Sequence, residues 1–75
     1  MPLLPRHAFG QNVSRLRGER GLTQEDLAEL AEIDRRYVQR IEAGTANPGI
    51  DVIVRIKNAL AVGWEKLLIN TSKAG

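Results

Sequence analysis

The chain has 75 residues, 43% hydrophobic but only 4% aromatic, with a formal net charge of +2, so it should form one domain around one small aliphatic core. It contains no cysteine, which excludes disulfides and thiolate catalysis and argues against zinc fingers. No apolar run approaches the ~18 residues needed to span a bilayer and nothing resembles a signal peptide, so we expect a cytoplasmic protein with no membrane partner.

The first predicted helix runs from about Arg6 to Arg20, after an N-terminal arm of residues 1–5 that carries two prolines. Apolar residues recur on one side of it at the spacing of an inward-facing stripe, namely Phe9, Val13 and Leu16. Gly10 and Gly18 should each weaken this helix by about 1 kcal/mol relative to alanine.

A second predicted helix opens at Thr23. Asp26 follows three residues later, which approximates the capping box with aspartate in place of glutamate or glutamine. Its inward residues are Leu27, Ala28 and Ala31. A three-residue break, Glu32 to Asp34, separates it from the next helix.

The third predicted helix spans residues 35–43, with Asp34 as its N-cap and Gly44 as its stop. At 3.6 residues per turn, one side of it is apolar, with Tyr37, Val38 and Ile41. The opposite side carries three arginines and a glutamine and no acid: Arg35, Arg36, Gln39 and Arg40. Arginine pairs with guanine and glutamine with adenine in the major groove, and a helix of about 13 Å fits that groove. Periodicity alone equally fits an ordinary helix with a solvated basic face.

The rest of the chain is predicted as a loop at residues 45–49, a helix from Ile50 to Ala61 and a short helix from Trp64 to Ile69. Residues 52–54 are β-branched and ambiguous between helix and strand. We therefore predict an all-α fold, a compact five-helix domain at residues 6–70 followed by a flexible tail at residues 71–75.

This order of residues resembles the helix-turn-helix family of phage repressors and Cro proteins, the XRE-type DNA-binding domain. The resemblance covers about Phe9 to Leu68. It is carried by Leu16-Arg17, Gly21-Leu22-Thr23-Gln24, Leu27-Ala28, Tyr37-Val38, Ile41-Glu42, Gly44, Pro48, Ile56, Ala59-Leu60 and Leu67-Leu68. It implies a lambda-repressor-like domain that regulates transcription, with the helix at residues 35–43 in the major groove of DNA.

The resemblance also implies roles for individual residues. The residues predicted to contact base edges are Arg35, Arg36, Gln39 and Arg40. The residues predicted to contact the DNA backbone are Thr23, Gln24, Asp34, Tyr37, Thr45 and Asn47. Tyr37 is included because it sits at the edge of the apolar face beside Arg40, and a purely core role for it stays open. Arg17 and Glu42 match a pair that forms an internal salt bridge in such domains.

Two residues depart from the family pattern. Glu32 stands where glycine is usual in the turn, and it is strained if the backbone there keeps a positive φ. Lys57 stands where a small residue is usual, and its stem should pack while its ammonium reaches solvent.

A module this small offers few DNA contacts, so we expect a homodimer on a pseudo-palindromic operator. The predicted dimer surface is Trp64, Leu67, Leu68 and Ile69, because these exceed what the small core can absorb. The alternative is that about half of them cap that core.

Catalysis is not expected, because His7 is the only histidine and lies without a nucleophile or a metal-ligand spacing; we interpret it as a surface or capping residue. No metal, cofactor or small-molecule effector is indicated. Among regulators we favour a restriction–modification controller protein over a phage-type repressor, since the chain carries little beyond one domain. An antitoxin-like protein-interaction module on the same fold is the alternative from another class.

Overall fold

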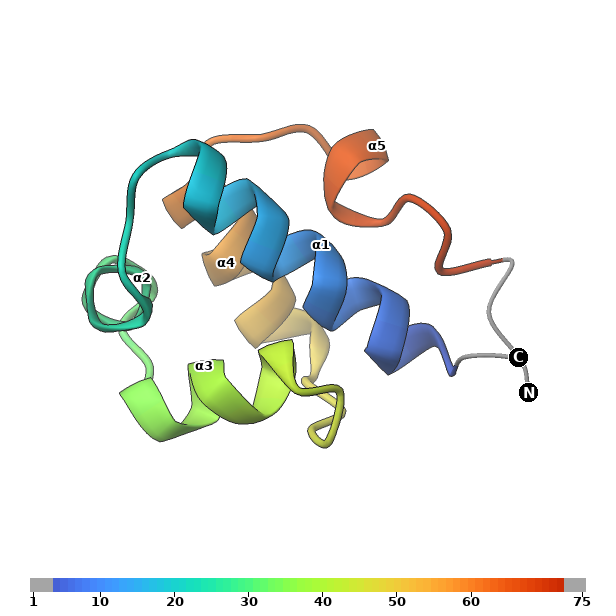
Figure 1. Cartoon of the computed structure of the whole chain (residues 1–75), viewed down its shortest axis with the longest axis horizontal. Helices are drawn as coiled ribbons and strands as arrows, with labels where there is room; N and C mark the ends of the chain where they lie inside the picture. The colour runs from blue at the N-terminus through green and yellow to red at the C-terminus, as the bar shows by residue number, and fades with distance from the viewer. Residues whose placement is uncertain (1–3, 73–75) are drawn as a thin grey trace.

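The structure, a computed structural model, describes residues 4–72 as five helices joined by short loops (Figure 1). The helices are α1 (Pro5–Glu19), α2 (Gln24–Ala31), α3 (Arg35–Glu42), α4 (Ile50–Leu60) and α5 (Trp64–Leu67). The all-α prediction is confirmed, and the ambiguous run at residues 52–54 lies inside α4. Predicted bounds agree within one residue except for the last helix, which ends at Leu67 instead of Ile69. Residues 1–3 of the predicted arm and 73–75 of the predicted tail lie outside the described residues.

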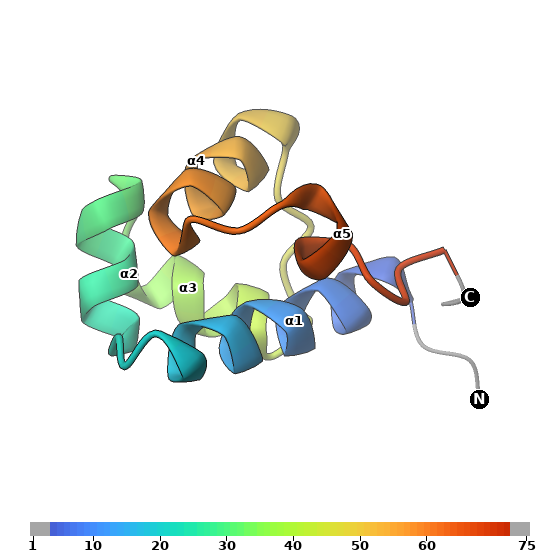
Figure 2. The ribbon, with the colours of Figure 1, turned by 90° about the horizontal axis from the view of Figure 1, so that it is seen from above.

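The helices enclose one core, with α1 running across the molecule, α3 along one edge and α5 packed back against α1 (Figures 1 and 2). The predicted inward residues of the first three helices are buried, except Tyr37, which is half-buried against the core. The core consists of Phe9, Val13, Leu16, Leu27, Ala28, Ala31, Val38, Ile41, Ala46, Ile56, Leu60 and Leu67. Each fully buried leucine or isoleucine contributes roughly 1.5–3 kcal/mol of transfer free energy. Among the described residues, no helix has the length and apolar character needed to cross a membrane.

Both predicted N-caps are present. The Thr23 hydroxyl accepts from the Asp26 N–H at 3.0 Å, while the Asp26 carboxylate accepts from the Thr23 N–H at 2.9 Å. These hydrogen bonds from the backbone and side chain of Thr23 hold the pKa of Asp26 below its ordinary value, so the capping carboxylate stays charged at neutral pH. At α3, the Asp34 carboxylate accepts from the Arg36 N–H at 2.8 Å.

The four longer helices all end in the same hydrogen-bond pattern, the Schellman motif. At the end of α3, the Thr45 N–H donates to the Arg40 carbonyl and the Gly44 N–H to the Ile41 carbonyl, both at 3.0 Å. Gly44 adopts φ +77°, the left-handed conformation that the motif needs and that glycine takes without steric cost.

Glu32 occupies the equivalent left-handed position after α2, with φ +57°. A β-carbon in this region costs about 1 kcal/mol, so Glu32→Gly is expected to stabilise the protein and raise its Tm by roughly 4–8 °C. Thermal unfolding followed by circular dichroism checks this. Glu29→Gly, inside α2, is the control and should lower Tm, because glycine weakens a helix interior. A Tm for Glu32→Gly at or below that of the parent would contradict the assigned strain.

Helix α1 crosses α3 at Gly10. A β-carbon there would overlap the Ile41 carbonyl oxygen and lie 3.1 Å from that of Glu42. The sequence predicted only that Gly10 weakens α1; the crossing shows that its missing side chain is what lets the two backbones meet.

One turn earlier, the His7 side chain packs on Gly44, where an added β-carbon would overlap the imidazole. Nδ1 of His7 accepts from the Leu4 N–H at 3.1 Å, which confirms the capping interpretation. The N-terminal half of α1 therefore rests on the C-terminal end of α3.

A buried asparagine, which the sequence analysis did not single out, holds the end of α5. Asn12 is 5% exposed, and its Nδ2 donates to the carbonyls of Leu67 and Ile69, each at 2.8 Å. Thr71, placed in the predicted tail, donates from its hydroxyl to the Leu68 carbonyl at 2.7 Å. The turn after α5 is therefore tied both to α1 and to itself.

Candidate nucleic-acid interface

The outward face of α3 is basic and solvent-exposed. It carries all four predicted base-readout side chains, Arg35, Arg36, Gln39 and Arg40. Val38 and Ile41, at 0% and 1% exposure, anchor the opposite face in the core. Within residues 4–72 the ion pairs are Arg15–Glu19 and Arg17–Glu42, so no carboxylate neutralises the arginines of α3. The guanidinium groups on this face remain available for a ligand.

Tyr37 lies at the border of the basic face. Its ring is half-buried and packs against the core, and the Arg40 guanidinium carbon lies 5.9 Å from the ring centroid. This cation–π contact, worth about 0.5–1 kcal/mol at an exposed site, limits the orientations of Arg40. The contact of the Tyr37 hydroxyl with DNA stays a prediction.

Arg17 and Glu42 form an ion pair that joins α1 to α3. The Arg17 Nε donates to Glu42 Oε2 at 2.7 Å, and Nη2 donates to Oε1 at 3.1 Å. The hydrogen bonds that Arg17 donates to Glu42 raise the pKa of Arg17 above its ordinary value despite partial burial, so the guanidinium stays charged. A further bond from Nη1 to the Leu22 carbonyl, at 2.8 Å, ties in the loop before α2.

Gln24, at the start of α2, joins the same cluster. Its Nε2 donates to Glu42 Oε1 at 3.0 Å, a contact that the sequence did not reveal because the two residues are 18 positions apart. One hydrogen of the amide is therefore held inside the protein, while the second hydrogen of the –NH₂ group remains for an external acceptor. Glu42 thus sets the orientation of a side chain predicted to touch the DNA backbone.

Removing the charge of Glu42 is expected to destabilise the protein strongly. In Glu42→Gln the half-buried Arg17 loses its counter-charge, which should cost about 2 kcal/mol after allowance for partial solvent exposure. The matched control is Glu19→Gln, since the Arg15–Glu19 pair is exposed and spans 4.0 Å. The control should change the unfolding free energy by less than about 0.5 kcal/mol. Urea unfolding measures both; equal effects would show that burial does not distinguish the two pairs.

The other four residues predicted to contact the DNA backbone are exposed, and three of them already form hydrogen bonds within the protein. Thr23 and Asp34 form the N-caps described above, and Thr45 donates from its hydroxyl to the Arg40 carbonyl at 3.2 Å. The exposed Asn47 lies in the loop that follows α3 along the same edge of the molecule (Figure 1). At the start of α2, the N–H groups of Gln24 and the next residue have no acceptor within the helix. The capping hydrogen bonds are sufficient to explain why Thr23 and Asp34 stand at these two positions. The contact of either residue with DNA stays a prediction.

The prediction of the dimer surface is wrong for one of its four residues, Leu67. Leu67 is 0% exposed and belongs to the core, because α5 makes a single turn that directs this side chain inward. Trp64, Leu68 and Ile69 are 42%, 38% and 50% exposed and remain on the surface. The alternative that some of the four cap the core is therefore correct for Leu67.

Lys57 lies beside this surface. Its ammonium is 5.1 Å from the Trp64 ring centroid, and the residue is half-buried. The stem packs while the charge reaches the surface, as the departure from the family pattern predicted. The cation also limits the orientations of the tryptophan ring.

Comparison with known proteins agrees with this arrangement. The family described as helix-turn-helix matches residues 13–67. The control protein C.BamHI of Bacillus amyloliquefaciens is 39% identical over 61 residues, which cover 80% of this chain and 75% of that protein.

Two solved structures are similar over nearly their whole length. The restriction–modification controller protein C.AhdI from Aeromonas hydrophila superposes with a TM-score of 0.79 at 37% identity, over 83% of this chain and 94% of that one. The controller protein C.Esp1396I, solved as a tetramer in complex with its natural 35 base-pair operator, gives 0.80 at 29% identity, over 92% and 91%. The chain belongs to the helix-turn-helix family of XRE-type, Cro- and repressor-like transcriptional regulators, whose members include restriction–modification controller proteins.

Proposed function

We propose that the protein regulates transcription by binding a specific double-stranded DNA operator, with α3 in the major groove. The observation that carries this proposal is the exposed face of α3, where three arginines and a glutamine lie together without a neutralising acid. Guanidinium and carboxamide groups on one helix face are the donors and acceptors that distinguish guanine and adenine edges. The opposite face is held rigidly in the core, so these groups meet DNA as one unit.

Contacts around α3 would fix the register of the helix on the duplex. The second amide hydrogen of Gln24 and the free N–H groups at the start of α2 are suited to one phosphate. Thr45 and Asn47 are suited to phosphates beyond the other end of α3. The positive end of the α2 dipole adds attraction for the first phosphate.

The protein is proposed to act as a homodimer. One copy of α3 reaches few base pairs, and two-fold symmetry would place two copies about 34 Å apart in successive turns of the major groove. Trp64, Leu68 and Ile69 offer an exposed apolar surface that a second copy would bury.

Within this function we favour a restriction–modification controller protein. The support is the similarity to C.BamHI and C.AhdI, which are proteins of that kind. A phage-type repressor is the alternative within the family, and the position of the operator relative to endonuclease or repressor genes would discriminate between them. We further propose that the protein is not an enzyme, acts in the cytoplasm and needs no small-molecule effector.

Selection of bound duplexes from a random-sequence pool tests the proposal. An enriched inverted repeat with fixed spacing is expected for a dimeric regulator, whereas a single enriched half-site would overturn the dimer. The absence of enrichment by folded protein would favour an antitoxin-like module that binds protein. Affinity for the selected duplex should also fall steeply with salt, with a slope of about −0.9 per phosphate contact.

A further inference from the structure

The first turn of α1 reaches the same edge of the molecule as α3. Gly10 packs on the carbonyls of Ile41 and Glu42, and His7 packs on Gly44 at the end of α3. Residues four apart on a helix share a face, so Arg6 continues the face of Gly10 by one turn. Because α3 has ended by that point, Arg6 meets the loop that follows it.

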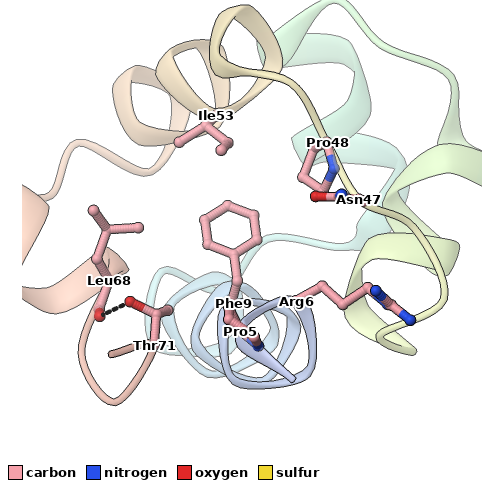
Figure 3. Close-up of a pocket in the computed structure, with 8 residues that line it drawn as sticks. All are labelled: Pro5, Arg6, Phe9, Asn47, Pro48, Ile53, Leu68 and Thr71. Atoms are coloured by element: carbon pink, nitrogen blue, oxygen red, sulfur yellow. Dashed lines mark hydrogen bonds between the residues drawn. The ribbon is translucent and has the colours of Figure 1, made fainter. Parts of the chain in front are cut away.

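The side chain of Arg6 lies beside that loop. It lines an apolar pocket of about 220 Å³, to which Phe9, Asn47, Pro48, Leu68 and Thr71 also contribute. In Figure 3 the arginine extends away from Leu68 and Thr71, on the side of the pocket where Asn47 and Pro48 lie. Its methylene groups cover apolar surface, while the guanidinium lies next to the loop that is proposed above to contact the DNA backbone.

No carboxylate within residues 4–72 forms an ion pair that would hold the Arg6 guanidinium in this position. Within residues 4–72, Arg6 is in neither of the two ion pairs, and one turn along α1 the groups that face Gly10 are the carbonyl oxygens of Ile41 and Glu42. Arg15, on the same helix, is by contrast paired with Glu19 at 4.0 Å. Arg6 is thus a half-buried cation that lines the pocket on the side of Asn47 and Pro48.

We propose that Arg6 binds a DNA backbone phosphate beyond the loop of Thr45 and Asn47, so that the interface extends from α3 to the first turn of α1. The inference rests on the proposed function and adds a contact to it. A guanidinium binds phosphate with two parallel hydrogen bonds, which suits a cation whose stem is already positioned. The sequence analysis had placed Arg6 only at the start of the first helix.

The test compares Arg6→Gln with Arg15→Gln on the selected operator and on a duplex of arbitrary sequence across a salt series. Each subunit of the dimer loses one phosphate contact, so Arg6→Gln should reduce the salt slope by about 1.8 and weaken binding roughly 60-fold at 0.1 M salt, on both duplexes. Arg15→Gln removes the same charge from the same helix and should leave the slope unchanged. Arg6→Lys keeps the charge and should restore the slope.

Each outcome bears on a different claim. An unchanged slope for Arg6→Gln, with parent protein that binds in a salt-dependent way, would overturn the phosphate contact alone. A flat salt response of the parent protein would instead overturn the proposed function. Weaker binding with an unchanged slope, not rescued by Arg6→Lys and accompanied by a lower Tm, would assign Arg6 to the support of α3 and also overturn the contact.

Discussion

Gly10→Ala is expected to lower Tm by roughly 12–24 °C. The new β-carbon would overlap the Ile41 carbonyl oxygen and crowd that of Glu42. Both are backbone atoms of α3, so they cannot move aside as the end of a flexible side chain would. Separating α1 from α3 loosens the buried contacts between them, at a cost of about 3 kcal/mol.

Gly18→Ala is the matched control for this substitution. Gly18 also lies within α1, but a β-carbon there meets no atom within 4 Å. Alanine favours a helix by about 1 kcal/mol over glycine, so this variant should gain stability. Thermal and urea unfolding would distinguish the two. If Gly10→Ala were as stable as the control, the close crossing of α1 and α3 would be wrong.

Leu68→Glu is expected to weaken dimerisation by at least about 100-fold, since a carboxylate left unpaired in an apolar interface costs about 3 kcal/mol or more. Operator binding should fall with it at protein concentrations below the new dimer dissociation constant. Sedimentation equilibrium measures the first effect, and titration of the selected operator the second. Leu68 is 38% exposed, so part of its surface is free to meet a second copy.

Two further variants keep this prediction testable. Leu68 also lines the pocket beside Phe9, so a loss of Tm would confuse the result. Ile69→Glu, at a residue 50% exposed, should break the dimer without touching that pocket. Leu30→Glu, at an apolar residue 58% exposed on α2, should leave dimerisation unchanged. Dimerisation that survives both substitutions on the turn after α5 would move the interface elsewhere.

The sequence predicted the parts of the fold that depend on local chemistry. The caps at Thr23 and Asp34 and the left-handed stop at Gly44 involve atoms within a few residues of each other, so residue type and spacing are sufficient evidence. The inward stripes follow from the 3.6-residue period for the same reason. The position of the last helix was right but its length was not, because the turn after Leu67 is set by Asn12, 55 residues earlier.

For the candidate interface, the basic face of α3 was readable because its residues share one helix. The hydrogen bond between Gln24 and Glu42 could not be predicted from the sequence. The family resemblance did predict the ion pair of Arg17 with Glu42. No periodicity relates positions on different helices. Their contact depends on the angle at which those helices cross.

By itself the sequence determined five helices, the caps at Thr23 and Asp34, one aliphatic core and a helix whose outward face is basic. Only the tertiary structure decided what glycine does at position 10, which way Leu67 faces, and that Arg6 stands beside the loop of Asn47. Helix formation and capping depend on hydrogen bonds between near neighbours in the chain. Burial, close backbone approach and the reach of a cation instead depend on how helices pack, which the whole core decides together.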